Sequence, residues 1–163
     1  MERLMGSKYD AINRSMSKKT VKIIRGLSGV GKSTYVMMTI GVAKAEERWI
    51  VCSADDYFVN EQGQYEFVGY KVPMAHQWCW GKFIDGIGEG RNIIVDNTNT
   101  QPWEYENYIK LAKLFDYEVE IIHITPKGLT NEELAKRNTH GVPLESIEQM
   151  RLRWVDDTRQ IDV

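Results

Sequence analysis

Apolar residues along the chain gather in four short runs, at positions 20–25, 49–53, 92–96 and 117–124. Within each run the apolar residues stand mostly at neighbouring positions and do not alternate strictly with polar ones. Such runs are typical of strands that are covered on both faces, as the strands of a parallel sheet are. The pattern therefore predicts buried parallel strands.

Between and after these runs the apolar positions change to helical spacing; Val36, Ile40 and Ala43, for example, fall on one helix face. The predicted helices cover 34–44, 73–87, 102–115, 131–138 and 143–154, with a break between the last two at 140–143. This alternation predicts an α/β fold of three layers, with a parallel sheet of about four to five strands. Ligands of such sheets bind beyond the carboxyl ends of the strands.

Composition narrows the class of protein. A chain of 163 residues, 42% apolar and 27% charged, is typical of one globular domain. The sequence has no apolar run of membrane-spanning length and no secretory signal pattern. Cys52 and Cys79 have neither metal-ligand spacing nor a disulfide framework, so a reducing cytoplasmic location is expected, in the host if a phage encodes the chain. The net charge of −2 argues against a broadly basic nucleic-acid binder, so any such contact is expected to be local and salt-sensitive.

The segment 26–33 reads GLSGVGKS and fits G-x-x-x-x-G-K-[ST], the phosphate-binding loop or P-loop. It lies between a predicted strand and a predicted helix, which is the context that the motif needs. Backbone N–H groups and the helix N-terminus cradle phosphates in such a loop, Lys32 reaches the outer phosphates, and the Ser33 hydroxyl holds Mg²⁺. The motif predicts a nucleoside triphosphate site made of Gly26, Ser28, Gly29, Val30, Gly31, Lys32, Ser33 and Thr34.

Other features favour a kinase among P-loop proteins. The chain has no N-K-x-D segment for guanine recognition, no D-x-x-G segment in a switch-like position, and no second domain such as a ring ATPase needs. The broken helical segment near its end looks like a kinase lid, at about 128–143. Phosphoryl transfer needs such a lid, because water must be excluded and cations placed over the migrating phosphate.

Together with the P-loop, segments 53–57, 96–99 and 134–138 resemble the kinase domain of polynucleotide kinases, of both the bacteriophage type and the animal polynucleotide kinase/phosphatase type. The pair Ala75-His76, the D-N-T-N segment at 96–99 and the R-N-x-H-G-V-P segment at 137–143 are most similar to the kinase group of the Nedd4-binding protein. The resemblance covers 20–154 and implies a P-loop kinase domain over 19–163 with a helical lid. Residues 1–18 lack clear periodicity and are predicted to form a mobile arm or a short helix.

This resemblance implies a Mg²⁺- and ATP-dependent kinase that transfers the γ-phosphoryl group to a hydroxyl of a nucleic acid, DNA or RNA. Asp55 would be the general base, and Lys32 and Arg137 would act with it, Arg137 also contacting the donor phosphates. Independently of the resemblance, the position of Asp55 supports the same role, because a carboxylate at the carboxyl end of a strand can face the γ-phosphate. The alternatives are that Asp55 or Asp56 merely caps the following turn, and that Arg137 lies on a solvated helix face.

Further candidates surround the acceptor. Asp96 is predicted to hold the Mg²⁺ shell with Ser33 or to bind the acceptor, and Asn97 matches a family position near it, although an Asx turn explains this segment as well. Arg153 matches the family better than Arg151 as an arginine that points into the site, with a surface role as the alternative. Asp56 is expected either to cap the turn or to orient its neighbours in the site.

The segment 57–70 is rich in aromatic residues and lies where an acceptor would enter, so rings such as Phe58 are predicted to stack on a base or to cover a lid hinge. His76 shares a helical stripe with Cys79 and Phe83, which favours a packed core histidine. The family's alanine-histidine pair implies a substrate contact for His76 instead.

The chain departs from the family at Phe58, where the bacteriophage enzymes carry an arginine that grips the acceptor's phosphate. Two other acceptors therefore stay open: 5-hydroxymethylpyrimidine bases in DNA, which related phage kinases phosphorylate, and a nucleoside or small metabolite. A nucleotide-binding regulator without phosphotransfer is a further alternative, but such a protein needs neither Asp55 nor Arg137.

Overall fold

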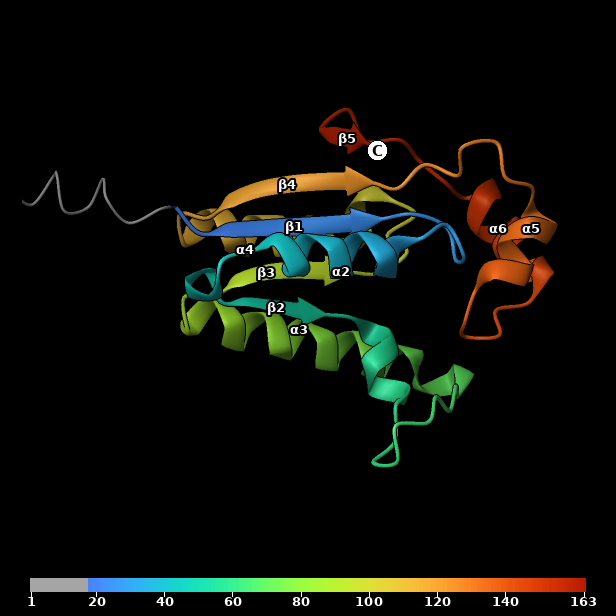
Figure 1. The fold of residues 1–163 in the computed structure, drawn as a ribbon, viewed down its shortest axis with the longest axis horizontal. Coiled ribbons are helices and arrows are strands. Elements are labelled where there is room, and N and C mark those ends of the chain that lie inside the picture. Colours follow the sequence, from blue (N-terminus) through green and yellow to red (C-terminus); the bar gives the residue numbers. More distant parts are fainter. Residues whose placement is uncertain (1–17) are drawn as a thin grey trace, which may run out of the picture.

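The computed structural model describes residues 18–163, and five parallel strands form the centre of this part (Figure 1). The strands are β1 (Thr20–Arg25), β2 (Trp49–Cys52), β3 (Asn92–Asp96), β4 (Glu118–His123) and β5 (Gln160–Asp162). Their order in the sheet is β2-β3-β1-β4-β5, and each neighbouring pair is parallel. The parallel sheet predicted from the apolar runs is confirmed.

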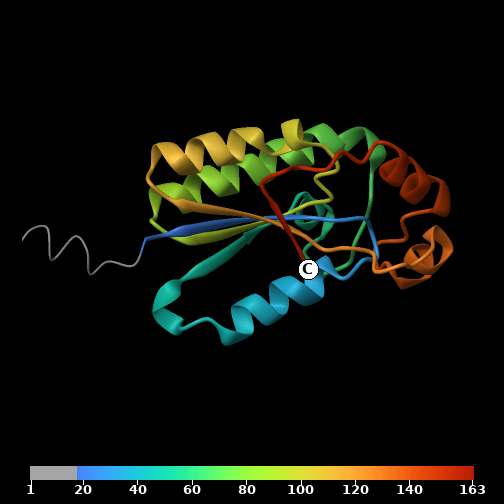
Figure 2. The same cartoon turned by 90° about the horizontal axis from the view of Figure 1, so that it is seen from above.

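Helices cover both faces of the sheet, which makes three layers (Figure 2). Helix α2 (Lys32–Val42) lies on one face, and α3 (Val72–Gly88) and α4 (Glu106–Leu114) lie side by side on the other. Helices α5 (Asn131–Arg137) and α6 (Leu144–Leu152) cover neither face but stand beyond the carboxyl ends of the strands (Figure 1). This arrangement confirms the predicted three-layer α/β fold.

Two apolar clusters follow from these layers. Phe83 and Ile109 pack with Ile23 on the α3–α4 side of the sheet. On the other side, Ile24 and Val36 share a cluster with Leu134 of α5 and Ile147 of α6. Side chains of successive strand residues point to opposite faces, so Ile23 and Ile24 belong to different clusters. The second cluster is what attaches α5 and α6 to the sheet.

The structure refines two predicted elements. The helix predicted over 102–115 is divided at Tyr105. With a φ of −123°, this residue is not helical, so a short 3₁₀ helix, η4 (Pro102–Glu104), ends there and α4 begins after it. Strand β5 has no counterpart among the four apolar runs, because its three residues QID contain a single apolar side chain. Three more 3₁₀ helices connect the main elements: η1 (Ala45–Glu47), η2 (Ala54–Phe58) and η3 (Gly69–Lys71).

The arm predicted over residues 1–18 lies outside the described residues except for Lys18. Within 18–163, no helix is long and apolar enough to cross a membrane. Cys52 and Cys79 are both buried and unpaired.

Candidate active site

The P-loop leaves β1 at Gly26 and ends where α2 begins. Gly31 is the N-cap of α2 and has a φ of 108°, a left-handed backbone conformation that glycine adopts readily. The Lys32 ammonium lies back over the loop and donates to the carbonyls of Gly26 and Leu27, each at 3.0 Å. Burial lowers the pKa of Lys32, while the charges of Asp96 and Asp55 oppose that shift. The lysine is therefore held between the phosphate loop and two carboxylates.

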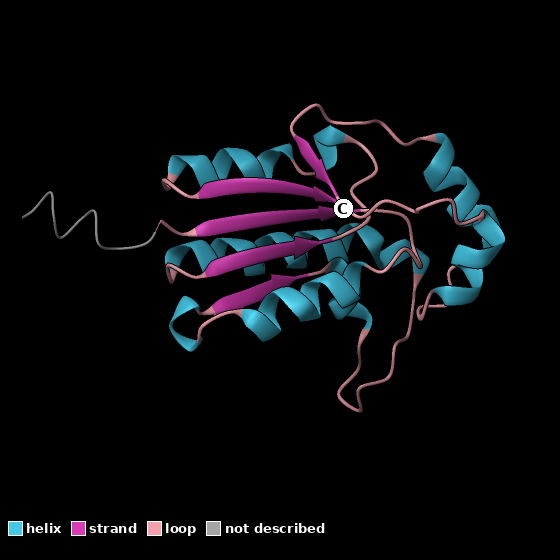
Figure 3. Cartoon of the chain, turned by 45° about the horizontal axis from the view of Figure 1, so that its top comes forward, coloured by secondary structure: helices cyan, strands magenta, loops and turns pink. Residues whose placement is uncertain are grey.

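A cavity of about 810 Å³ opens beyond the carboxyl ends of the strands, where the loops and the lid helices gather (Figure 3). Its walls come from the P-loop, η2, the ends of β2 and β3, the start of α3, and the segment from Arg137 to Arg153. All the predicted site residues line this cavity except Gly26 and Val30. The fold thus brings together side chains that are more than 100 positions apart in the sequence.

Gly26 and Val30 do not line the cavity, but both help to fix the conformation of the P-loop. The Val30 side chain is buried in the cluster that contains Ile24. A Cβ atom on Gly26 would lie 2.9 Å from Val30 Cγ1 and 3.0 Å from the Ile124 carbonyl oxygen, so a larger residue would displace the loop. The backbone N–H of Gly26 donates to the Thr98 carbonyl over 3.0 Å, which ties the P-loop to the end of β3.

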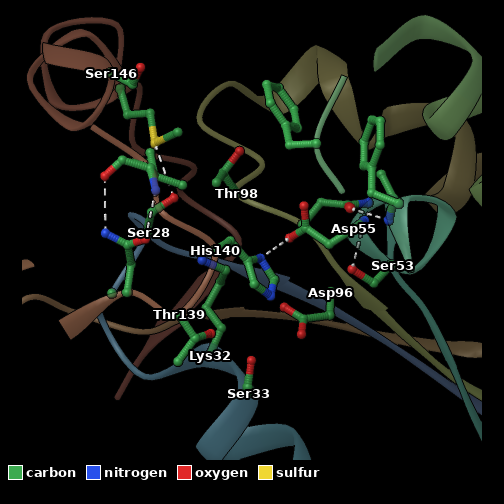
Figure 4. Close-up of a pocket in the computed structure, with 18 of the residues that line it drawn as sticks. Ser28, Lys32, Ser33, Ser53, Asp55, Asp96, Thr98, Thr139, His140 and Ser146 are labelled. Atoms are coloured by element: carbon green, nitrogen blue, oxygen red, sulfur yellow. Dashed lines mark hydrogen bonds and ion pairs between the residues drawn. The ribbon is translucent and has the colours of Figure 1, made fainter. Parts of the chain in front are cut away.

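Asp55 stands on η2, across the cavity from the P-loop (Figure 4). Ser53 caps this helix, because its hydroxyl accepts from the Asp55 backbone N–H at 3.3 Å, so capping does not occupy the Asp55 carboxylate. That carboxylate accepts from the Tyr65 hydroxyl at 3.2 Å and lies 3.1 Å from His140 Nδ1. Burial, followed by the nearby Asp55 charge, raises the pKa of Tyr65, so its phenol stays protonated and donates.

Asp96 ends β3 beside Lys32, and its Oδ1 atom is buried with no hydrogen-bond partner among the described residues. Burial raises the pKa of this carboxyl, and the Lys32 charge opposes the rise. A buried carboxylate oxygen without a partner, with the exposed Ser33 hydroxyl at the start of α2 in the same cavity, suits Mg²⁺, which binds oxygen and keeps some of its waters. The two residues predicted to hold Mg²⁺ therefore fit that ion chemically.

Asn97 and Asp56 both line the cavity, but neighbouring groups already engage their side chains. The Asn97 amide oxygen accepts from the Ala54 backbone N–H at 2.9 Å, which fastens the end of β3 to the helix that carries Asp55. One Asp56 oxygen lies 3.4 Å from the Lys82 ammonium on α3. In this structure both side chains hold η2 in place.

His76 is not the packed core histidine that its helical stripe favoured. It is exposed and lines the cavity near the start of α3, whereas Ala75 and Cys79 of the same helix are buried. The stripe was misread because the buried face of α3 runs through Ala75, Cys79 and Phe83, one residue away from His76.

Phe58 is 7% exposed and packs against the rings of Tyr57, Tyr65 and Phe67, with centroids 5.1 to 6.1 Å away. It forms part of the cavity wall, but this packing takes up the ring face that base stacking would need. Phe67, which is 58% exposed, is a more accessible ring in the same wall.

The two predicted arginines enter the cavity from the lid side. Arg137 is exposed at the end of α5. Arg153 follows α6, and its Nε atom donates to the Thr100 hydroxyl at 3.0 Å. That hydroxyl in turn donates to Glu104 at 2.8 Å, so Thr100 links Arg153 to η4.

His140 is a site residue that the residue-by-residue reading did not single out. It lies in the break between α5 and α6, where periodicity gives no signal, and only its place in the R-N-x-H-G-V-P segment marked it. Its ring stacks on Tyr65 with centroids 4.4 Å apart and an interplanar angle of 16°.

Comparison with known proteins places the chain in a family. A family model described as an AAA domain matches residues 21–155. The chain belongs to the AAA domain family. Over 130 residues the chain is 35% identical to human NEDD4-binding protein 2. The matched segment makes up 78% of this chain but only 7% of that protein.

Solved structures show the same fold at low sequence identity. A chain of the Pnkp1/Rnl/Hen1 RNA repair complex matches with a TM-score of 0.65 and 19% identity, over 87% of this chain and 46% of that chain. Kti12 of Chaetomium thermophilum, in complex with ADP-AlF₃, matches with a TM-score of 0.55 and 12% identity, over 88% of both chains. The predicted resemblance to P-loop kinases of the polynucleotide kinase type is confirmed, and this AAA domain is a kinase-like nucleotide-binding domain.

Proposed function

We propose that this AAA domain is a Mg²⁺- and ATP-dependent kinase that transfers the γ-phosphoryl group to a hydroxyl of a nucleic acid, as polynucleotide 5′-hydroxyl kinases do. One observation carries the proposal. The Asp55 carboxylate faces the P-loop across one cavity, and its negative charge partly offsets the lowering of the Lys32 pKa by burial. A site that only bound nucleotide would not need this carboxylate.

The P-loop side of the cavity is suited to the donor. Backbone N–H groups around Gly29 and Gly31, with the N-terminus of α2, would bind the phosphates of ATP. Lys32 and Arg137 would place positive charge beside the β- and γ-phosphates. Ser33 and Asp96 would hold a magnesium ion, which neutralises charge on the transferring phosphoryl group when it is bound.

Asp55 would act on the acceptor. Its carboxylate accepts the hydroxyl proton while the acceptor oxygen forms a bond to the γ-phosphorus. The bond between that phosphorus and the β–γ bridging oxygen breaks at the same time, and ADP leaves with the electron pair. The lid, which in the structure consists of α5, α6 and the turn between them, would cover the reacting groups and exclude the water that would otherwise hydrolyse ATP.

A nucleic-acid acceptor is supported by aromatic and cationic side chains that line the cavity. Phe67 and Trp103 line the cavity with exposed rings, which are suited to stacking on bases, and Arg153 offers a cation for a phosphate. The similarity in fold to a chain of an RNA repair complex points in the same direction. The unpaired, buried cysteines fit the cytoplasm as the place of action.

The test offers γ-labelled ATP with separate acceptors: DNA and RNA oligonucleotides that end in a 5′-hydroxyl, DNA containing hydroxymethyluracil, and a panel of nucleosides. Label on a 5′-hydroxyl oligonucleotide is the expected result. Label on hydroxymethyluracil or on a nucleoside alone would replace the proposed acceptor. Label on none of them, with ATP still bound, would show a nucleotide-binding regulator.

Asp55→Asn tests the proposed base. The amide cannot take a proton, so transfer is expected to fall by about 10²- to 10⁴-fold while ATP affinity changes little. Asp85→Asn is the matched control, because Asp85 is an exposed aspartate on α3 outside the cavity. Undiminished turnover in Asp55→Asn would disprove the assignment.

A further inference from the structure

We propose that His140 is a positioning residue that holds the Asp55 carboxylate, and that the lid presents it to Asp55 only while the lid is docked on the P-loop. This inference rests on the proposed function of Asp55 as the base. It gives the lid a second task besides covering the donor: completing the group that activates the acceptor.

The contact involves both oxygens of Asp55. Tyr65 donates its hydroxyl to Oδ1 at 3.2 Å, and His140 Nδ1 lies 3.1 Å from Oδ2 (Figure 4). An ionised carboxylate only accepts, so the histidine must carry its proton on Nδ1. The imidazole also stacks on the Tyr65 ring at 4.4 Å, which fixes its plane. Two residues, Tyr65 of the 59–68 loop and His140 of the lid, therefore hold the one carboxylate that η2 presents.

The loop that carries His140 is itself closed by Asn138. The Asn138 amide nitrogen donates to the carbonyls of Ala135 and Val142, at 2.7 and 3.1 Å. Its amide oxygen accepts from the Val142 backbone N–H at 2.8 Å. These three bonds join the end of α5 to Val142, so His140 projects from a closed turn. The imidazole is consequently placed by the position of the whole lid.

The lid in turn rests on the P-loop. A Cβ atom on Gly29 would lie 2.1 Å from the Leu134 carbonyl oxygen and 3.2 Å from the Asn138 nitrogen, so the α5 backbone lies directly against the phosphate loop. The Ser28 hydroxyl also lies 3.6 Å from the Met150 sulfur on α6. The P-loop therefore contacts α5, Asn138 joins the end of α5 to the turn that carries His140, and His140 contacts Asp55.

These contacts leave Asp55 able to work as a base. Two carboxylate oxygens offer about four lone-pair positions, and Tyr65 and His140 use two of them, so an acceptor hydroxyl can still bind. The ionisable groups around the cluster are Asp56 on η2, Asp96 on β3, Lys32 on α2, His76 on α3 and Arg137 on α5. Holding the carboxylate in one orientation matters because a misplacement of about 1 Å costs roughly 10²-fold in rate.

Three substitutions of His140 test this role through kcat. His140→Ala removes the donor and is expected to lower kcat by about ten- to hundredfold, with the KM for ATP changed by less than about twofold. Asparagine puts an amide nitrogen where Nδ1 stood, whereas glutamine puts one where Nε2 stood. His140→Asn should therefore recover most of the lost kcat, and His140→Gln should not.

His123→Asn is the matched control for the kinetic test, because His123 makes a similar contact, Nδ1 to Asp162 Oδ1 at 2.9 Å, outside the cavity. It should leave kcat unchanged. A role that was merely structural in the lid would raise the KM for ATP and would not distinguish asparagine from glutamine. Unchanged kcat in His140→Ala, or equal kcat in the asparagine and glutamine variants, would overturn the proposal.

A second measurement does not depend on catalysis. The chain has three histidines, so the ring resonances of His140 can be assigned in an NMR spectrum by comparison with His140→Asn. Removing the carboxylate partner with Asp55→Asn should shift the ring resonances of His140, because Nδ1 loses a charged acceptor, and should leave those of His123 in place. Unshifted His140 resonances would overturn the contact.

The two measurements separate the proposals. If the unmodified protein phosphorylates no acceptor, the proposed kinase function fails, and the NMR spectra still decide whether His140 and Asp55 are paired. If the protein is an active kinase but the His140 variants behave like the His123 control, the proposed function stands and the positioning role fails.

Discussion

Gly29 shows how one residue connects nucleotide binding to the lid. Its φ of 81° is a left-handed conformation, and the carbonyl of Leu134 occupies the space that a side chain would need. Two separate constraints thus act at one position. The backbone angle requires a residue that tolerates left-handed geometry, and the close approach of the lid excludes a methyl group.

Gly29→Ala should therefore weaken ATP binding by about tenfold or more, because the added Cβ atom must displace either the loop or the lid. Isothermal titration calorimetry with Mg²⁺·ATP measures the change. Gly63→Ala is the matched control, since Gly63 has a φ of 78° and no atom of residues 18–163 lies within 4 Å of an added Cβ. Equal ATP affinity in the two variants would show that the lid does not press on the P-loop.

The residue scale also shows what the sequence could and could not predict. The P-loop motif is local, and the structure has the predicted loop between a strand and a helix, with Lys32 and Ser33 in the first turn of that helix. His76 was misread because two neighbouring positions of a helix can both fit an apolar stripe, and only packing decides which is buried. His140 lies in a turn whose position depends on bonds of Asn138 and on contacts with the P-loop, and no spacing rule encodes these.

Among the elements, β5 depends most on contacts made elsewhere in the chain. The segment before it is fixed by Asp157, which accepts from the Tyr105 hydroxyl at 2.7 Å and from Arg159 Nη2 at 2.7 Å. Arg159 also pairs with Glu106 on α4 at 2.9 Å. Buried Arg25 of β1 donates to the Val155 carbonyl at 2.7 Å in the same segment. Polar contacts position this strand, which has only one apolar residue, and the pattern of apolar residues therefore did not predict it.

The stability of this region should depend on pH. The hydrogen bond from Arg159 holds the pKa of Asp157 well below its usual range, so Asp157 stabilises the folded state while it is ionised. That contribution is complete above the pKa of an unfolded aspartate, about 3.9, and is lost as the pH falls toward the lower folded value.

Asp157→Asn should lower the free energy of unfolding by about 1–2 kcal/mol at neutral pH, a value reduced by the partial exposure of Arg159 to solvent. The difference from the unmodified protein should shrink as the pH falls below about 4. Thermal melts between neutral and acid pH, with Asp85→Asn as an exposed control, measure it. A pH-independent difference would mean that the aspartate charge is not what stabilises this segment.

At the scale of the whole molecule, the strand order explains why the site was predictable in outline. The order β2-β3-β1-β4-β5 makes β3 the neighbour of β1, so the ends of β1, β2 and β3 lie at one edge of the sheet. Asp55, Asp96 and the P-loop follow these three ends. The predicted parallel strands already imply that Asp55, Asp96 and the P-loop lie close together. The position of the lid over these residues does not follow from the strands.

The overall charge of −2 leads to a prediction about nucleic acid. Because the net charge is negative, binding of an oligonucleotide should rely on a few cations at the cavity, such as Arg153. Each phosphate contact with a single strand contributes about −0.7 to the slope of log affinity against log salt, so one or two contacts predict a slope of about −1. Oligonucleotide affinities at several salt concentrations test this, and a slope of about −5 would reveal a much larger basic interface.

The contact between Gly29 and α5 has a consequence for how the lid opens. Helices of seven and nine residues, as α5 and α6 are, are too short to persist alone in water. They remain helical because Leu134 and Ile147 are buried and because the α5 backbone lies against the phosphate loop. We therefore expect the lid to open by local unfolding and not as a rigid flap, and a nucleotide that binds only the closed form would stabilise the folded lid.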